Sequence, residues 1–267
     1  SPRAKSVYEG DIKIVTPDIS NRNNFAISNK FRHFKNTCYV INLSKEKETL
    51  SNFILGLLNS SMLEFYFKHI SPFLSGSYYR YKTQYLERLP IKLPQIPEEQ
   101  NFADKITNKV EYILEQVKLD QKIENFPDEY IDEYRSRGEE FDSINIIFNS
   151  DHKALEPVIE AEISGSGYNI ILGKKEKPIF VDSKAKADYI TAALKGKRAK
   201  KDEKLQLLVP KSDAIVEAIL KKMEEDKEKV KSPSVAELEA EINALVYTLY
   251  GLNEEDIKVI EDFLQRF

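Results

Sequence analysis

Hydrophobic residues in the C-terminal two thirds of the chain recur mainly at helical spacing. The series that starts with Phe102 and Ile106 continues at three- and four-residue steps and predicts a long helix from residue 98 to about 125, where Pro127 ends it. Similar series predict further helices over residues 184–194, 212–229, 237–250 and 254–267. Gly251 suits a left-handed C-cap and Asn253 an N-cap, so the last two helices should form a hairpin.

Shorter runs rich in β-branched and aromatic residues predict strands. In the first hundred residues such a run covers residues 37–43, and a helix with Ser51 as N-cap is expected over residues 49–71. The tyrosine-rich segment 78–85 is expected to be a strand with alternate side chains on opposite faces. Further runs predict strands at residues 144–148, 168–172, 178–181 and 205–209.

A proline-rich segment separates two regions of different character. Residues 89–97 contain three prolines, which cannot continue a helix and favour an extended strap. We therefore expect a domain over residues 1–97 and a second region over residues 98–267 that holds a small α/β insert at about 141–210. The predicted fold class is α+β: a mixed domain, a long helix, the insert and a helical hairpin at the C-terminus.

The two regions carry charge of opposite sign. Residues 1–97 contain 14 Lys and Arg against 7 Asp and Glu, a net charge of +7, and residues 98–267 contain 26 against 37, a net charge of −11. A basic block of this size is typical of a surface that binds a polyanion, although segregated solvated charge gives the same count.

Composition excludes several classes of protein. With 41% hydrophobic and 31% charged residues in 267, the chain can bury a core and is not disordered throughout. Its apolar runs are far shorter than the roughly 20 residues of a membrane span, so we expect a soluble protein. The single Cys38 excludes internal disulfides and fits the cytoplasm, and the separated His33, His69 and His152 do not predict a zinc site. Because the chain starts with Ser and not Met, we expect a piece of a longer protein.

Signatures of common enzymes are missing, and the remaining candidates for chemistry are weak. Asp182-x-Lys184 after a predicted strand resembles part of a metal-dependent nuclease site, but it lacks a well-placed second carboxylate. Glu160 and Glu162 could pair for acid–base chemistry, or simply lie on a solvated face. The segment 195–204 has five lysines and one arginine and could contact phosphate, or be a solvated loop.

The segment 76–82 combines side chains that suit a nucleic acid. Arg80 could bind guanine or phosphate through two hydrogen bonds, Lys82 could pair with a phosphate, and Tyr78 could stack on a base. In the predicted strand, Arg80 and Lys82 should point outward while Tyr79 and Tyr81 are partly buried.

These motifs resemble a known family. The run Thr16-Pro17-Asp18-Ile19-Ser20-Asn21-Arg22 is followed by 36–41 (Asn-Thr-Cys-Tyr-Val-Ile), by 54–60 (Ile-Leu-Gly-Leu-Leu-Asn-Ser) and by a block from Ser75 to Ile91 that contains Tyr-Arg-Tyr-Lys and Leu-Pro-Ile. Their order and spacing resemble the TaqI-like C-terminal specificity domain of N6-adenine DNA methyltransferases and type IIG restriction–modification enzymes. The resemblance covers roughly residues 10–97; the C-terminal hairpin resembles the ends of the same enzymes, and residues 125–232 resemble no family.

The resemblance implies a module that recognises a sequence in double-stranded DNA. In this family an N-terminal methyltransferase domain of the same protein binds S-adenosylmethionine, and a nuclease domain, where there is one, uses Mg²⁺. This chain shows the motifs of neither, so we expect it to bind DNA without methylating or cutting it, and to need no cofactor of its own.

The residues expected to bind DNA divide by role. Phosphate contacts are expected from cations in the basic domain: Arg22, Arg32, Lys35 and Lys82. Base contacts are expected from Asn23, Asn24, Ser77 and Arg80, with Tyr78 beside them. The alternative is a protein-interaction scaffold in which the helices at 98–124 and 212–229 and the terminal hairpin expose their apolar stripes to a partner.

Overall fold

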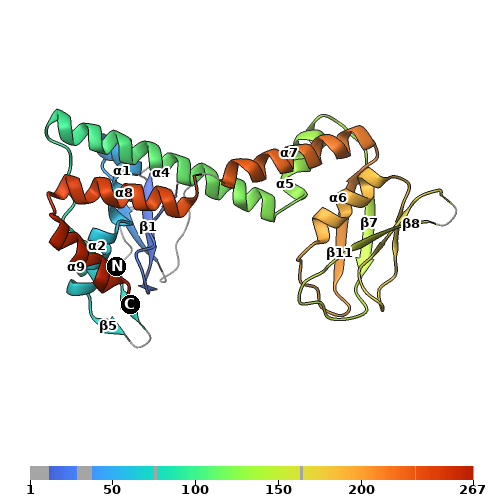
Figure 1. Ribbon diagram of the computed structural model, residues 1–267, viewed down its shortest axis with the longest axis horizontal. Helices are drawn as coiled ribbons and strands as arrows, with labels where there is room; N and C mark the ends of the chain where they lie inside the picture. The colour runs from blue at the N-terminus through green and yellow to red at the C-terminus, as the bar shows by residue number, and fades with distance from the viewer. Residues whose placement is uncertain (1–11, 29–37, 75–76, 163–164, 232, 267) are drawn as a thin grey trace, which may run out of the picture. The chain divides into compact units, whose positions relative to one another are not determined.

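The computed structural model describes residues 12–28, 38–74, 77–162, 165–231 and 233–266. Small antiparallel sheets and long helices make up the described chain, which confirms the predicted α+β class (Figure 1). In the part of the chain that the structure covers, no helix is both long enough and apolar enough to cross a membrane.

The chain divides into two compact units, described separately here. The terminal unit comprises residues 1–115 and 233–267, and the insert unit comprises residues 116–232. This division differs from the sequence boundary at residue 97, because the strap that follows Leu89 is fixed to the C-terminal helices. Tyr250 donates a hydrogen bond to the Pro90 carbonyl at 2.5 Å, and the Lys92 ammonium donates to the Leu249 carbonyl at 2.7 Å.

The terminal unit contains two three-stranded sheets. In the first, β1 (Lys13–Pro17) pairs antiparallel with β3 (Ala26–Ser28) on one side and β4 (Cys38–Asn42) on the other. Strand β4 confirms the strand expected at residues 37–43. In the second sheet, β6 (Tyr78–Arg80) lies between β2 (Ile19–Ser20) and β5 (Phe73–Leu74). The expected strand at 78–85 is therefore shorter, since α3 (Thr83–Leu86) begins three residues after β6.

The single helix expected over residues 49–71 is wrong, because the structure has two α-helices there. A 3₁₀ helix (Lys45–Leu50) leads into α1 (Ser51–Leu58), and α2 (Ser61–Ile70) follows after Asn59 and Ser60. Ser51 is not an N-cap, since it is already the first helical residue. The serine that caps is Ser60, whose hydroxyl accepts a hydrogen bond from the Leu63 N–H.

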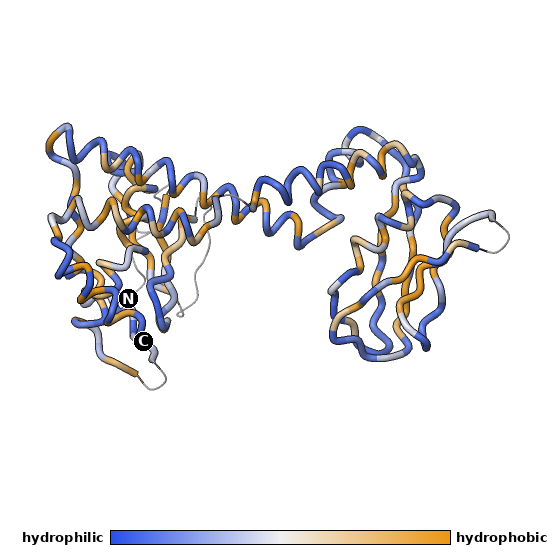
Figure 2. The backbone as a smooth tube through the Cα atoms, viewed as in Figure 1, coloured by the Kyte–Doolittle hydropathy of each residue, from blue (hydrophilic) through white to orange (hydrophobic). Residues whose placement is uncertain are grey.

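The predicted long helix is confirmed as α4 (Pro97–Glu124), and the hairpin as α8 (Val235–Tyr250) and α9 (Glu254–Leu264). Gly251 has the expected left-handed conformation (φ +68°), and Asn253 caps α9. Figure 2 shows hydrophobic positions recurring among hydrophilic ones along α4. The buried positions of α4 and α8 share one core with α1, namely Ala103, Ile106, Val110, Ile242, Val246, Leu249, Phe53 and Leu57. Burial of these stripes against each other weighs against the scaffold alternative.

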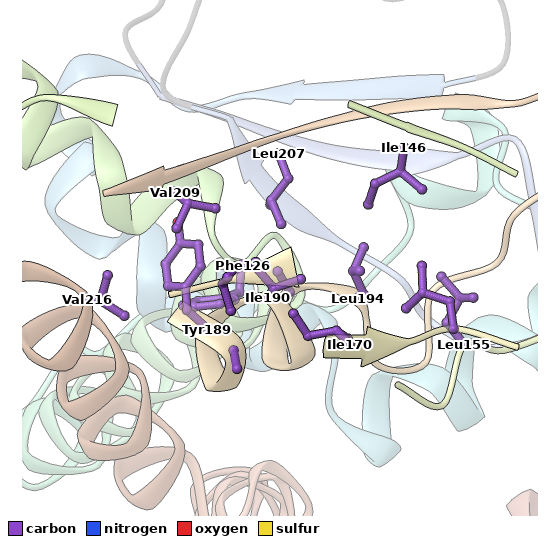
Figure 3. Close-up of a cluster of buried hydrophobic side chains, with 14 of the residues drawn as sticks. Phe126, Ile146, Leu155, Ile170, Tyr189, Ile190, Leu194, Leu207, Val209 and Val216 are labelled. Atoms are coloured by element: carbon purple, nitrogen blue, oxygen red, sulfur yellow. The ribbon is translucent and has the colours of Figure 1, made fainter. Parts of the chain in front are cut away.

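The insert unit confirms the strands and helices predicted there. Strands β7 (Phe141–Ile147) and β11 (Lys204–Pro210) form one antiparallel pair, and β8 (Val158–Ala161), β9 (Tyr168–Ile171) and β10 (Ile179–Val181) form a three-stranded sheet. Helix α6 (Lys184–Leu194) has the predicted bounds, whereas β8 was not expected. Figure 3 shows the core that joins α6 to these strands, with Tyr189, Ile190 and Leu194 of α6 among strand residues such as Ile170 and Leu207.

Two further helices of the insert unit surround a buried carboxylate. Helices α5 (Asp128–Ser136) and α7 (Asp213–Lys231) pack against each other, and Lys122 near the end of α4 contacts Tyr130 of α5 and Asp226 of α7; α5 was not expected from the sequence. Asp226 of α7 is only 1% exposed. It accepts a hydrogen bond from the Tyr130 hydroxyl at 3.1 Å and pairs with the Lys122 ammonium at 3.3 Å. The pairing gives this buried charge the partners that it needs.

Candidate nucleic-acid interface

The second sheet of the terminal unit brings two of the predicted DNA-binding segments to one edge. Ile19 pairs with Arg80 and Ser20 with Tyr79 in antiparallel register. Asn21 and Arg22 follow β2 directly, and Ser77 directly precedes β6, so both segments lie at the same end of this antiparallel pair. We call the segments 21–24 and 77–78 together the recognition edge.

The recognition edge exposes a cation, two amides and an aromatic ring. Arg22 and Asn24 are exposed, and Tyr78 is 45% exposed. Ser77 has φ +64°, a left-handed conformation that a residue other than glycine adopts only at some cost, and its side chain is half-buried. Asn21 is exposed as well, so the edge offers one phosphate-binding group, two amides with both donor and acceptor, and one stacking surface.

The motif Leu58-Asn59-Ser60, called the Leu-Asn-Ser motif below, fixes the backbone of Phe25, the residue that follows segment 21–24. The Asn59 side chain accepts a hydrogen bond from the Phe25 N–H at 2.9 Å and donates one to the Phe25 carbonyl at 3.0 Å. The Asn59 side chain thus satisfies both backbone hydrogen-bonding groups of Phe25, as a neighbouring strand would in a sheet. The next residue, Ser60, caps α2, so one motif fixes both the recognition edge and the start of a helix. Sequence inspection singled out this motif but assigned it no role.

Asn23 is buried beneath the recognition edge and belongs to the hydrogen-bonded frame that holds it. It is 7% exposed; its amide donates to the Leu58 carbonyl at 2.6 Å and accepts from the Tyr81 hydroxyl at 2.9 Å. The Asn23 side chain could contact a base only by breaking both bonds. The geometry therefore gives no support to Asn23 as a base-reading residue and places it among the groups that position Arg22 and Asn24.

Tyr79 and Tyr81 are core residues, buried more completely than the sequence pattern predicted. Tyr81 is fully buried and stacks on Phe67 with ring centroids 4.2 Å apart. Tyr79 is 3% exposed and lies over the Lys68 ammonium, which pairs with Glu64 at 2.7 Å. Burial, and next the charge of Glu64, raise the pKa of both phenols, so each hydroxyl stays protonated.

Arg80 points away from the core as predicted, but it has a partner. Its guanidinium donates to the Asp18 carboxylate at 2.9 Å, and its side chain is 39% exposed. The hydrogen bond with Asp18 is the main cause that raises the pKa of Arg80. Lys82 is half-buried, and the structure pairs it with no carboxylate of the described residues. Lys82 is therefore the freer cation of the two, and Arg80 would have to exchange Asp18 for a base or phosphate.

Some predicted residues cannot be placed. Arg32, Lys35 and His33 lie outside the described residues, as do Arg3, Lys5 and Lys30. Five of the fourteen Lys and Arg of residues 1–97 are therefore not located. Of the predicted positions, Arg22, Asn24, Ser77 and Tyr78 lie on the two segments that meet at the same end of the second sheet.

The other candidates for chemistry lie in ordinary surroundings. Asp182 pairs with Lys186 at 2.9 Å, and Lys184 pairs with Asp188 one helical turn away. Glu160 is exposed on β8, and Glu162 follows the end of that strand and is half-buried. Among the described residues, no three His, Cys, Asp or Glu side chains are grouped so that they could hold a metal ion.

Comparison with known proteins bears on the N-terminal third of the chain. No curated protein matches the chain. Residues 92–267, which include the whole insert unit, lie outside the family match. Residues 1–91, which contain both segments of the recognition edge and the Leu-Asn-Ser motif, match the model of the TaqI-like C-terminal specificity domain, the family whose motifs the sequence resembles.

Proposed function

We propose that the terminal unit recognises a sequence in double-stranded DNA and positions it for a methyltransferase domain of the same protein. The family match supports DNA sequence recognition, since it is a match to a specificity domain. The recognition edge supports the proposal in geometry, because exposed groups are held on a buried and hydrogen-bonded frame. Preorganised groups on a rigid frame lose little freedom on binding.

The exposed groups have distinct roles in this proposal. Arg22 and Lys82 bind phosphates, which sets the register of the protein on the duplex without reading its sequence. Asn24 reads a base edge through its amide, whose donor and acceptor match adenine in the major groove. Tyr78 packs against sugar or base, and Arg80 reads a guanine if DNA binding displaces Asp18.

Catalysis is assigned to other parts of the proposed parent enzyme. We propose that a methyltransferase domain N-terminal to the specificity domain binds S-adenosylmethionine and methylates the adenine N6, and that Mg²⁺ is needed only if a nuclease domain is present. The specificity domain supplies recognition and not chemistry, and the proposed compartment is the cytoplasm. The resemblance of the sequence motifs supports this division of labour.

The observation that carries the proposal is the pairing of β2 with β6, which brings the segments of Arg22 and Tyr78 to the same end of one sheet within the matched region. The test is fluorescence anisotropy of the chain with a duplex selected from a random pool. Arg22→Ala is expected to weaken binding by about 10-fold and to lower the salt dependence by roughly one phosphate contact. Arg88→Ala is the control, because Arg88 is also exposed but lies outside the recognition edge and is not among the proposed DNA contacts.

Base reading has its own readout. Asn24→Ala is expected to reduce the preference for the selected duplex over a random one by about 5- to 100-fold, while binding to the random duplex stays the same. Equal binding of selected and random duplexes by the unaltered chain would refute sequence recognition. Equal effects of Arg22→Ala and Arg88→Ala would refute the recognition edge as the contact surface.

A further inference from the structure

Three loops of the insert unit gather cations. They connect β7 to β8 (residues 148–157), β9 to β10 (172–178) and α6 to β11 (195–203). Together they contain nine Lys and Arg against five Asp and Glu, although the whole insert unit contains 22 against 24. We call these three segments the basic loops. Their nine cations are Lys153, Lys174, Lys175, Lys177, Lys195, Lys197, Arg198, Lys200 and Lys201.

Hydrogen bonds hold the three loops side by side. His152 and Ala199 exchange backbone hydrogen bonds of 2.7 and 3.1 Å. Next to them, Leu155 donates to the Lys197 carbonyl at 2.9 Å. The third loop joins through the Asn149 amide, which donates to the Lys175 carbonyl at 3.1 Å. The three loops that carry the cations are therefore fixed to one another by hydrogen bonds and do not move independently.

Three of the five carboxylates in these loops bind backbone N–H groups. Asp151 accepts from the Lys201 N–H at 2.9 Å, and Glu203 accepts from the Lys200 N–H at 2.7 Å. Glu176, with a side chain 2% exposed, accepts from the Asn149 N–H at 2.8 Å and also binds the Ser150 hydroxyl and His152. These three acids thus fix the loops and do not pair with the ammonium groups of the described loop lysines.

Most cations of the three loops are exposed to solvent and form no ion pair among the described residues. Eight of the nine are exposed, and Lys197 alone is half-buried, with its ammonium 3.4 Å from the Phe126 carbonyl. Within the described residues, none of the eight exposed cations forms an ion pair, whereas lysines elsewhere in the insert unit do: Lys184, Lys186, Lys211 and Lys227. Unpaired cations held close together repel one another, so a polyanion that neutralises them is favoured.

We propose that the basic loops bind the phosphate backbone of duplex DNA, as a second contact that does not read sequence. Lysine offers a point charge suited to phosphate, and eight of the nine cations are lysines. The identification of the polyanion as DNA rests on the proposed function of the terminal unit. Such a contact adds affinity through release of counterions and makes binding more sensitive to salt.

The experiment compares two triple variants of the full chain on a duplex of random sequence. The loop variant is Lys174→Gln, Lys175→Gln and Lys200→Gln. The control variant is Lys118→Gln, Lys221→Gln and Lys222→Gln, which removes the same charge from exposed lysines of α4 and α7 in the same unit. Anisotropy titrations at salt concentrations from about 50 to about 200 mM give the slope of log K against log salt.

The expected result is a slope smaller by up to about 2.7 in the loop variant, at about 0.9 for each lost contact. Over that salt range the unaltered chain then loses up to about 40-fold more affinity than the loop variant. The control variant should keep the slope of the unaltered chain. Circular dichroism of both variants checks that the fold is kept.

Three outcomes would overturn the inference. Equal slopes for loop and control variants would refute the basic loops as a DNA contact, while the selected-duplex assay of Arg22→Ala still tests the terminal unit separately. A larger effect of the loop variant on duplex RNA than on DNA would refute DNA as the polyanion. Absence of binding to any duplex at low salt would refute this inference and the proposed function together.

Discussion

The hydroxyl of Tyr81 is predicted to hold the recognition edge in place, and removing it tests the frame without disturbing the core. Tyr81→Phe keeps the ring, which is fully buried, stacks on Phe67 and makes an edge contact with Phe25 at 5.9 Å between centroids. The only bond that the structure gives the Tyr81 hydroxyl among described residues is the 2.9 Å hydrogen bond to the Asn23 amide oxygen.

The loss of stability expected for Tyr81→Phe follows from the burial of Asn23. Its amide oxygen loses its donor in a place that is 7% exposed, and a buried acceptor left without a partner costs about 1–3 kcal/mol. The unchanged ring contributes no loss of packing. We therefore expect Tyr81→Phe to lower the free energy of unfolding of the terminal unit by about 2 kcal/mol, a roughly 30-fold change in its unfolding equilibrium.

Hydrogen exchange read by mass spectrometry is the suitable assay, because the two compact units can unfold separately. Peptides from α1 and α2 report on the terminal unit, and peptides from β9 and α6 report on the insert unit and should not change. Tyr112→Phe is the matched control, since Tyr112 is 36% exposed and the structure gives it no hydrogen bond within the described residues. It should change stability by less than about 0.5 kcal/mol.

A double-mutant cycle with Asn23→Leu separates the hydrogen bond from other effects. If Tyr81 and Asn23 act through their mutual bond, the two losses should fall short of additivity by about 1 kcal/mol. Full additivity, or equal stabilities of Tyr81→Phe and Tyr112→Phe, would refute the reasoning. DNA binding by Tyr81→Phe should also weaken, because the edge that carries Arg22 loses part of its support.

Three further changes test the packing and the buried charges. Gly56→Ala should cost the terminal unit about 1–2 kcal/mol in urea unfolding, since its Cβ would lie 2.6 Å from the buried Ile106 methyl group; an unchanged midpoint would contradict this. Asp226→Ala should cost the insert unit about 2–3 kcal/mol by leaving Tyr130 and a lysine without their partner, whereas exposed Glu225→Ala should cost less than about 0.5. Burial alone raises the pKa of Glu176, but its hydrogen bonds outweigh burial and lower the pKa to about 2 from 4.5. The stability that results is present above pH 4.5 and is lost as the pH falls toward 2. Between about pH 6 and about pH 2 the free energy of unfolding of the unaltered chain should therefore fall by about 3 kcal/mol more than that of Glu176→Gln. An equal fall in the two proteins would contradict this prediction.

Much of the fold could be predicted because long periodic segments and caps are local signals. The bounds of α6, the left-handed Gly251 and the Asn253 cap depend on neighbouring residues alone. The break between α1 and α2 was missed because the apolar period continues through it. The break depends on Asn59 and Ser60, whose hydrogen bonds give the chain an alternative to the helix.

The candidate site was harder to predict, since it depends on contacts between distant segments. The positions of Arg22 and Tyr78 follow from the pairing of two very short strands, which have too few residues to show a period. Asp18 and Arg80 are 62 residues apart, so no spacing in the sequence indicates that they pair. Asn23 looks like a surface residue beside Arg22 and Asn24, and only the buried Tyr81 hydroxyl explains its place.

Several of the residues that make the family recognisable hold the fold and would not themselves read DNA. Gly56, Asn59 and Ser60 of one motif, and Tyr79 and Tyr81 of another, are buried, or are fixed by close packing or by hydrogen bonds to the backbone. Their side chains hold the frame, whereas Arg22 and Asn24 of the recognition edge precede both motifs in the sequence and Ser77 and Tyr78 lie between them. A motif built in this way identifies the scaffold and carries no information about the target sequence. Substitutions within the motif should therefore change stability first and binding in proportion to it, whereas Asn24→Ala should change preference between duplexes at unchanged stability. That contrast separates residues that hold the edge from residues that read DNA.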